Sequence, residues 1–184
     1  HPRDIYAASL LVGVGLGAMF NFTQPFAMQL GMRDVGGLFM GYTAAALFVR
    51  TALGGMPDRV GRRRVGVWAL ALYGCTVAAT AALRPGWLVP LGALLGCAHG
   101  VIYPALSALA VQDVPRGHRA SIMAIFTGAF NVGVGAGQVV FGPVAERYGF
   151  PPAFLLSGAV ILLGVPWLAR SRSASERRHD HTGL

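Results

Sequence analysis

The chain contains little charge and no lysine at all. Of its 184 residues, 15 are basic, all of them arginine, and 7 are acidic, so charged residues make up 12%. An ordinary soluble domain carries about 25%. Hydrophobic residues reach 54%, which leaves too few polar groups to cover a soluble fold and is far too high for a disordered chain. The composition therefore indicates a membrane protein.

Cysteine is also scarce, and its placement argues against a disulfide or metal framework. Cys75 and Cys97 each lie within an apolar run, and their spacing resembles neither a disulfide pattern nor a metal-ligand set. The sequence has no phosphate-binding loop and no cluster of His, Cys and carboxylate residues. We therefore expect no metal, no cofactor and no enzymatic activity.

Stretches without charge that are long enough to cross a bilayer recur six times. A bilayer core requires roughly 20 apolar residues in a helix, and strands of a membrane barrel would alternate in polarity, which these stretches do not. Arg50 is the one charged residue within them. The sequence thus predicts an all-α membrane protein with six transmembrane helices. The predicted spans are Ile5–Leu30, Gly36–Leu53, Val65–Leu83, Trp87–Val111, Ala120–Ala145 and Pro152–Ala169.

The arginines are divided unevenly between the two sides of this membrane. Six spans place both termini on one side, and that side carries 11 arginines against 3 on the other. The positive-inside rule then predicts that both termini are cytoplasmic, as in a multi-pass protein of the bacterial inner membrane. The same distribution argues against a nucleic-acid partner, because the charge sits on short loops and a tail rather than on one basic face.

The domain organisation follows from the same pattern. We expect residues 1–4 to form a short N-terminal stub, residues 5–169 the membrane domain, and residues 170–184 a basic, disordered cytoplasmic tail. The chain begins at His1 rather than Met and shows no secretory signal, which suggests a piece of a longer protein.

The loop after the second span carries the most specific motif in the chain. Its glycines permit tight turns with positive φ, its aspartate can cap a helix or pair with an arginine, and its arginines can meet anionic lipid headgroups. A merely basic loop would explain the arginines but not the aspartate or the glycines. The loop resembles the signature loop of the major facilitator superfamily, G-x-L-A-D-R-x-G-R-R/K, with Met56 and Pro57 as departures. The matching residues are Gly54, Asp58, Arg59, Gly61, Arg62 and Arg63.

This resemblance implies a fold and a function. Superfamily members have two six-helix halves, and this chain is similar to one of them. The amino-terminal half often carries an arginine in its fourth helix and a G-P-x-x-G-G pattern in its fifth. The fourth span here has no arginine, and the fifth span lacks the full pattern. The resemblance therefore favours the carboxy-terminal half of a sugar- or drug-efflux-like member. It implies secondary transport of a small solute by alternating access, more in keeping with export than import, with proton coupling left open. The implied partners are the solute, membrane lipids, and a missing six-helix half or a second copy of the chain.

Polar residues within the spans are the candidates for the transport pathway, since the first and fourth helices of each half line the central cavity in this superfamily. Asn21 and Gln24 lie three residues apart on one face and either contact solute or bond to other helices. His99 and Tyr103 share a face of the fourth span. Histidine is the side chain whose ordinary pKa lies nearest neutral pH, so His99 either couples proton movement to transport or is a neutral histidine bonded to a neighbouring helix. Asn131 in the fifth span is a further cavity candidate.

Two other features are expected at helix interfaces. Gly133 and Gly137 are spaced so that two helices can cross closely and slide during transport. A nucleotide-binding role for these glycines is excluded because they follow a transmembrane stretch and no strand. Arg50 is expected to reach the cytoplasmic interface and to pair with Asp58, or simply to extend its long side chain toward water.

Alternative functions belong to different classes. A half-length chain could be a structural or regulatory membrane protein that does not transport, or two copies could pair to rebuild twelve helices. An integral-membrane enzyme would need paired titratable residues near one interface, whereas the acidic residues here are scattered over separate loops.

Overall fold

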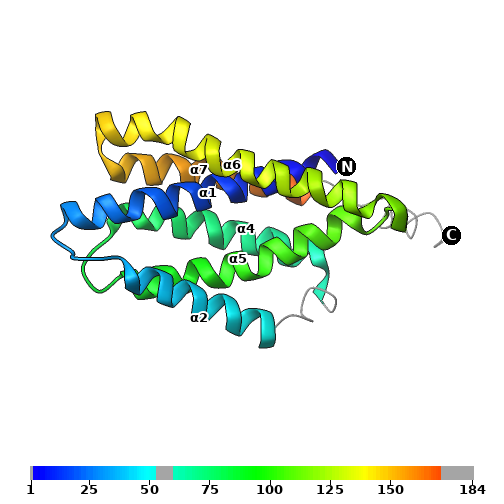
Figure 1. The fold of residues 1–184 in the computed structure, drawn as a ribbon, viewed down its shortest axis with the longest axis horizontal. Helices are drawn as coiled ribbons and strands as arrows, with labels where there is room; N and C mark the ends of the chain where they lie inside the picture. The colour runs from blue at the N-terminus through cyan, green and yellow to red at the C-terminus, as the bar shows by residue number, and fades with distance from the viewer. Residues whose placement is uncertain (1, 53–59, 171–184) are drawn as a thin grey trace.

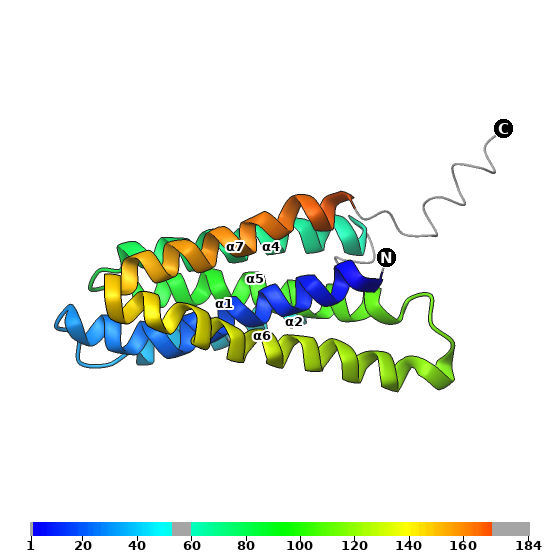
Figure 2. The same ribbon diagram turned by 90° about the horizontal axis from the view of Figure 1, so that it is seen from above.

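The computed structural model describes residues 2–52 and 60–170, which form six long helices (Figures 1 and 2). No strand occurs among these residues. There are also two short 3-10 helices: η1 (Thr80–Ala82) extends α4, and η2 (Arg116–His118) precedes α6. The long helices are α1 (Pro2–Gln29), α2 (Gly36–Ala52), α4 (Arg62–Ala79), α5 (Leu88–Val111), α6 (Arg119–Tyr148) and α7 (Phe150–Arg170).

Each of the six predicted spans falls on one of these helices. The shortest helix, α2, has 17 residues. The other five are long and apolar enough to cross a membrane, over Arg3–Gln29, Arg62–Ala82, Leu88–Val111, Arg116–Tyr148 and Phe150–Arg170. The prediction of an all-α membrane protein is therefore confirmed. Helix α1 already begins within the segment expected to be a stub, and the expected tail beyond residue 170 lies outside the described residues.

Two glycines fix sharp changes of chain direction. Gly61, directly before α4, has a φ of 103°, and Gly149, between α6 and α7, has a φ of 88°. A residue with a Cβ is strained in this region, so glycine is needed at both positions. The Gly149 N–H donates to the carbonyl of Ala145 at 3.0 Å, which closes α6 and lets α7 start at once. The turn at positive φ expected in the signature loop is thus present at Gly61.

The helices pack around one another in the order α2, α5, α4, α7, α1 and α6 (Figures 1 and 2). Helix α1 also contacts α5, which places these two helices in the middle of the bundle. Helices α2 and α6 lie at the two ends of the order. Helices α1 and α5 therefore lie behind the face of the bundle that α2 and α6 border.

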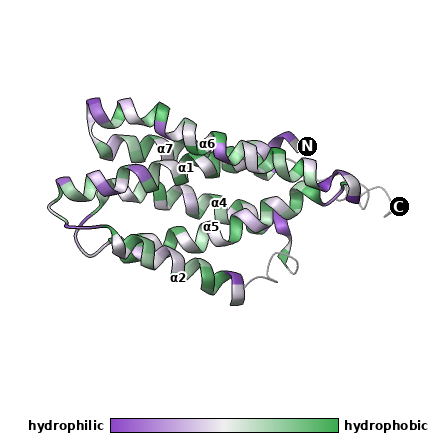
Figure 3. Ribbon diagram, viewed as in Figure 1, coloured by the Kyte–Doolittle hydropathy of each residue, from purple (hydrophilic) through white to green (hydrophobic). Residues whose placement is uncertain are grey.

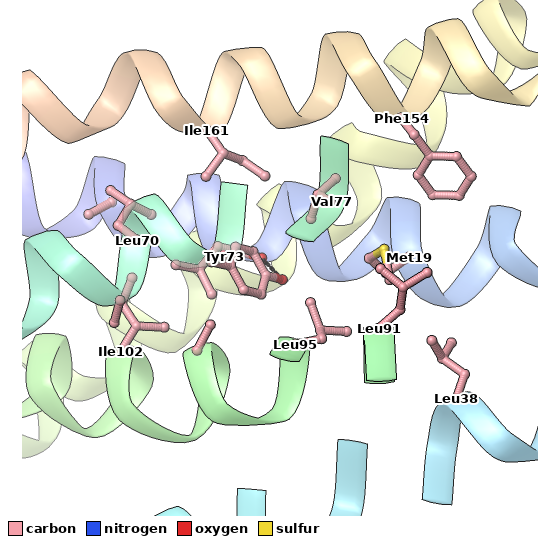
Figure 4. Close-up of a cluster of buried hydrophobic side chains, with 14 of the residues drawn as sticks. Met19, Leu38, Leu70, Tyr73, Val77, Leu91, Leu95, Ile102, Phe154 and Ile161 are labelled. Carbon is pink, nitrogen blue, oxygen red and sulfur yellow. Dashed lines mark hydrogen bonds between the residues drawn. The ribbon is translucent and has the colours of Figure 1, made fainter. Parts of the chain in front are cut away.

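The core is centred on Tyr73 of α4. This ring is fully buried, and its hydroxyl donates to the carbonyl oxygen of Val12 at 2.8 Å, so its polar atom is satisfied. Leu70, Leu95 and Ile161 surround it from α4, α5 and α7 (Figure 4). Because lipid is as apolar as these side chains, close packing rather than removal from water holds such helices together.

The outer surface of the bundle is apolar, and hydrophilic residues gather mainly near the helix ends (Figure 3). Large apolar side chains point outward along the helices, with Trp68 76% exposed, Leu163 74% and Val139 76%. In water such a surface would drive aggregation. In a bilayer it faces lipid, while the helical backbone satisfies its own hydrogen bonds.

Candidate functional site

The residues predicted to line a cavity fall into two groups. Asn21 and Gln24 on α1 and Asn131 on α6 are exposed, whereas His99 on α5 is buried and Tyr103 is half-buried. The Asn21 amide donates to a carbonyl of its own helix at 2.8 Å. Within the described ranges, no hydrogen bond joins the three amides to His99 or Tyr103. The structure thus brings together only the latter two.

His99 lies at the centre of a set of aromatic rings from four helices, here called the aromatic cluster. The centroid of its ring is 5.8 to 6.2 Å from those of the other four members. Tyr103 and Phe130 also pack edge to face against each other, with centroids 5.4 Å apart. The members are Tyr42 on α2, Tyr73 on α4, His99 and Tyr103 on α5, and Phe130 on α6.

Burial within the aromatic cluster increases toward the core. Tyr73 is fully buried and His99 is 7% exposed. Tyr42, Tyr103 and Phe130 are half-buried. These three rings therefore form the outer layer of the cluster, and they separate His99 from the surface of the bundle.

The two ring nitrogens of His99 have different surroundings. Nδ1 lies 2.7 Å from the Tyr42 hydroxyl, and this hydrogen bond joins α5 to α2. Nε2 is buried and has no hydrogen-bond partner in the described part of the chain. A buried polar atom without a partner costs free energy. The bond to Tyr42 suits a histidine that links two helices, but that role does not account for Nε2.

Sequence analysis did not identify three members of the cluster, Tyr42, Tyr73 and Phe130. The hydrogen bond between Tyr42 and His99 joins positions 57 residues apart, and no local sequence pattern predicts such a contact. The two tyrosines could have been singled out from the sequence, because a tyrosine in the middle of a span carries a hydroxyl that needs a hydrogen-bond partner.

Gly133 and Gly137 lie where α6 crosses α1 with the two backbones in contact. A Cβ at Gly133 would overlap the carbonyl oxygen of Leu10 on α1, and Gly137 is similarly confined. Helix α1 supplies a matching pair, Gly13 and Gly17, which lie against the backbone of α6. Both helices therefore contribute glycine to one close crossing.

A second crossing of this kind joins α2 and α5, and sequence analysis did not identify it. Three glycines spaced four apart on α5 lie against the backbone of α2, where a Cβ would be crowded. The spacing is visible in the sequence, but the sequence does not say which helix faces it. The glycines are Gly92, Gly96 and Gly100, which face Leu38, Tyr42 and Ala46 in that order.

The signature loop is described only in part. Gly54, Asp58 and Arg59 lie outside the described residues, and so does the expected pair between Arg50 and Asp58. Arg50 itself is exposed in the last turn of α2. Figure 1 shows that α2 ends before its neighbour α5 does, so the last turn of α2 lies alongside α5 rather than beyond it.

Arg63, in the first turn of α4, reaches the end of α7. Its guanidinium donates to the carbonyl oxygens of Leu168 at 3.2 Å and Ala169 at 2.6 Å. The last four carbonyls of a helix have no partner within it and carry the negative end of its dipole. This signature residue thus ties α4 to α7 at the end of the bundle where α1 begins (Figure 1).

Comparison with known proteins points to one family. A family model described as Major Facilitator Superfamily matches residues 5–183. An uncharacterized MFS-type transporter of Salmonella typhimurium is 24% identical over 156 residues, covering 84% of this chain and 40% of that protein. The multidrug resistance protein MdtG of Dickeya zeae is 24% identical over 181 residues, covering 94% and 44%. MdtG of Serratia proteamaculans is 27% identical over 139 residues, covering 74% and 34%.

The chain spans less than half the length of these curated relatives. The family match covers nearly the whole chain, including all six helices and the signature loop. This agrees with the resemblance carried by Gly61, Arg62 and Arg63 and with the apolar, all-helical bundle. The chain therefore belongs to the Major Facilitator Superfamily and is an integral membrane protein.

Proposed function

We propose that this chain is one six-helix half of a secondary transporter that moves a small solute by alternating access. The observation that carries the proposal is the family match over residues 5–183. The coverage of the relatives, 40% and 44%, supports a half. Two of the relatives are named multidrug resistance proteins, which supports export over import and a transporter over an enzyme.

We propose that the face between α2 and α6 lines the solute pathway. A second six-helix unit would cover this face, either the other half of one polypeptide or a second copy of this chain. Asn21, Gln24 and Asn131 are exposed amides, and amides at membrane depth need polar partners. These amides would contact the solute or the second unit, while His99 and Tyr103 would form part of the wall of the solute pathway.

The orientation proposed is the one that the arginines favour, with both termini in the cytoplasm of a bacterium. The membrane domain would then extend over residues 5–169 and be followed by a basic cytoplasmic tail. The contact of Arg63 with the end of α7 would lie on the cytoplasmic side. Near the middle of α6, the close crossing at Gly133 and Gly137 would hold α1 and α6 together, so that they would rock as one body.

A proteoliposome assay on the full-length protein tests the transport function. Solute movement is measured with and without an imposed pH gradient. We expect movement against the solute gradient that depends on the pH gradient. Movement that ignores the pH gradient would remove proton coupling and leave transport standing. A folded, reconstituted protein that moves no solute would contradict transport and favour the structural or regulatory alternative.

The amides on α1 have their own test within this assay. Replacing Asn21 and Gln24 together by Ala should raise the solute concentration needed for half-maximal transport. Gln138→Ala, another exposed amide on α6, is the matched control and should leave transport unchanged. Normal expression with unchanged kinetics in the double variant would remove Asn21 and Gln24 from the solute pathway.

A further inference from the structure

Two polar groups beside the aromatic cluster are not explained by helix packing. One is the Nε2 atom of His99, which is buried and without a partner among the described residues. The other is the guanidinium of Arg50, the charged group nearest the middle of the predicted spans. A buried donor without an acceptor costs free energy, and an arginine within a span is stabilised by an acceptor nearby, so one ligand could satisfy both groups.

The hydrogen bond to Tyr42 decides which ring nitrogen of His99 carries the hydrogen. A phenol O–H is a good donor and an imidazole nitrogen a good acceptor, so we assign the 2.7 Å contact as donation from Tyr42 to Nδ1. In a neutral imidazole the hydrogen is then on Nε2. The group left without a partner is therefore a donor, and what it requires is an acceptor.

The register of α2 on α5 places Arg50 near this donor. Tyr42, Ala46 and Arg50 follow one another at a spacing of four and so lie on one side of α2. Ala46 faces Gly100 of α5. Because the two helices run in the same direction, one further turn brings Arg50 level with the residues next to Tyr103.

Arg50 is also close enough to act on the same ligand as His99. Four residues separate His99 from Tyr103 along α5, which is a rise of about 6 Å. An arginine side chain has three methylenes before its guanidinium and can cover such a distance. Two donors, one of them charged, thus point to one acceptor.

The surroundings of these donors are aromatic and lack a nearby carboxylate. Among the described residues the acidic ones are Asp4 in the first turn of α1, Glu146 in the last turn of α6, Asp34 before α2 and Asp113 after α5. All four lie at or beyond a helix end, and none lies at the level of the aromatic cluster. A bound organic cation would therefore meet the positive charge of Arg50 with no described carboxylate to offset it.

We propose that the aromatic cluster binds a small aromatic carboxylate. The carboxylate oxygens accept hydrogen bonds from Nε2–H of His99 and from Arg50, and the ring of the ligand packs against Tyr103 and Phe130. Both rings are half-buried and form the outer layer of the cluster, so the ligand would enter past them. The inference rests on the proposed transport function and adds the chemical class of the solute, an organic anion rather than an organic cation.

Equilibrium binding to the purified full-length protein tests this, with three probes that share a benzene ring. The probes are benzoate, the neutral benzamide and the cationic benzyltrimethylammonium, measured by titration calorimetry in detergent. Benzoate should bind about tenfold tighter than benzamide or more, because charge-assisted hydrogen bonds are the stronger ones. The cation should neither bind nor displace benzoate.

Two variants separate the contributions of the two donors. Arg50→Gln should weaken benzoate binding by about 10- to 100-fold and leave benzamide binding unchanged, while Arg50→Lys should retain part of the affinity. Arg84→Gln, an exposed arginine at the opposite end of the bundle, is the matched control and should bind normally. His99→Phe keeps a ring but removes Nε2–H and should also weaken benzoate binding. If that variant is not monodisperse, Arg50→Gln decides alone.

The outcomes of these experiments separate the proposed ligand class from the proposed transport function on which it rests. Equal binding of benzoate and benzamide, tighter binding of the cation, or full benzoate binding by Arg50→Gln would each overturn the inference. A protein that transports another solute but does not bind benzoate retains its transport function and loses the proposed ligand class. Benzoate binding that depends on Arg50, in a protein that moves no solute, supports the binding site and contradicts transport.

Discussion

The two glycine crossings of the bundle are built differently. Where α1 crosses α6, both helices contribute a glycine pair, and the Ser9 hydroxyl of α1 donates to the Phe126 carbonyl of α6 at 3.0 Å. Where α2 crosses α5, three glycines come from α5 and two from α2, of which Gly41 lies against the backbone of α5 and Gly37 against its side chains. The polar link there joins two side chains, Tyr42 and His99.

The neighbours of the two crossings differ as well. Helix α6 packs against α1 and α7 and touches α5, whereas α2 packs mainly against α5. The further ring contacts of α2 to α1 run through Phe20. A helix with one main neighbour can move away from a clash, while a helix held from several sides cannot. The same glycine spacing therefore gives a fixed crossing at α1/α6 and an adjustable one at α2/α5.

The largest effect is expected from Gly133→Ala at the fixed crossing. The new Cβ would overlap the carbonyl oxygen of Leu10, so α1 and α6 would have to separate, at a cost of about 2–3 kcal/mol. Thermal unfolding in detergent measures the loss. Gly135→Ala on the same helix has open space around it and should be neutral or stabilising, since alanine favours helix by about 1 kcal/mol. Equal stability of the two variants would mean that α1 and α6 are not in close contact.

A smaller effect is expected from Gly96→Ala at the adjustable crossing. Its Cβ would press on the backbone of Tyr42, but α2 can shift outward, so we expect a loss of about 1 kcal/mol. Gly128→Ala, which lies in open space on α6, is the control for helix propensity. A loss at Gly96 as large as that at Gly133 would show that α2 is held as firmly as α6 and would remove the distinction between the crossings.

The fold was predictable from the sequence because a membrane leaves few alternatives. Backbone groups in lipid must bond within their own segment, so a long uncharged stretch becomes a helix. All six stretches did so. The positive φ of Gly61 was predictable for a similar reason, since a tight turn before α4 calls for a backbone conformation that residues with a Cβ rarely adopt.

The site was predictable only where chemistry stands out along the chain. His99 and Tyr103 are polar groups in an apolar span, and the structure brings them together. Tyr42 and Phe130 complete the cluster from α2 and α6, and their arrival depends on which helices pack side by side. Asn21 is equally polar in the sequence but lies apart from the cluster, since composition does not fix the direction in which a side chain points.

The third prediction concerns the polar link of the adjustable crossing. Tyr42→Phe leaves the buried Nδ1 of His99 without its donor, so we expect a loss of stability of about 0.8 kcal/mol. Hydrogen exchange should become faster in α2 and remain unchanged in α6. Tyr148→Phe removes a hydroxyl from an exposed tyrosine and should change neither quantity. Faster exchange throughout the bundle would mean that Tyr42 supports the whole fold and not one crossing.

The smallest effect is expected from Ser9→Ala, which removes the polar link of the fixed crossing. The Phe126 carbonyl still lies within the hydrogen-bonded ladder of α6, and the four glycines keep the helices in contact, so the loss should be about 0.5 kcal/mol. Hydrogen exchange in α1 and α6 should barely change. If Ser9→Ala costs more than Tyr42→Phe and loosens α6, then hydrogen bonding rather than backbone contact fixes that crossing, and the glycines serve only to let the serine reach its acceptor.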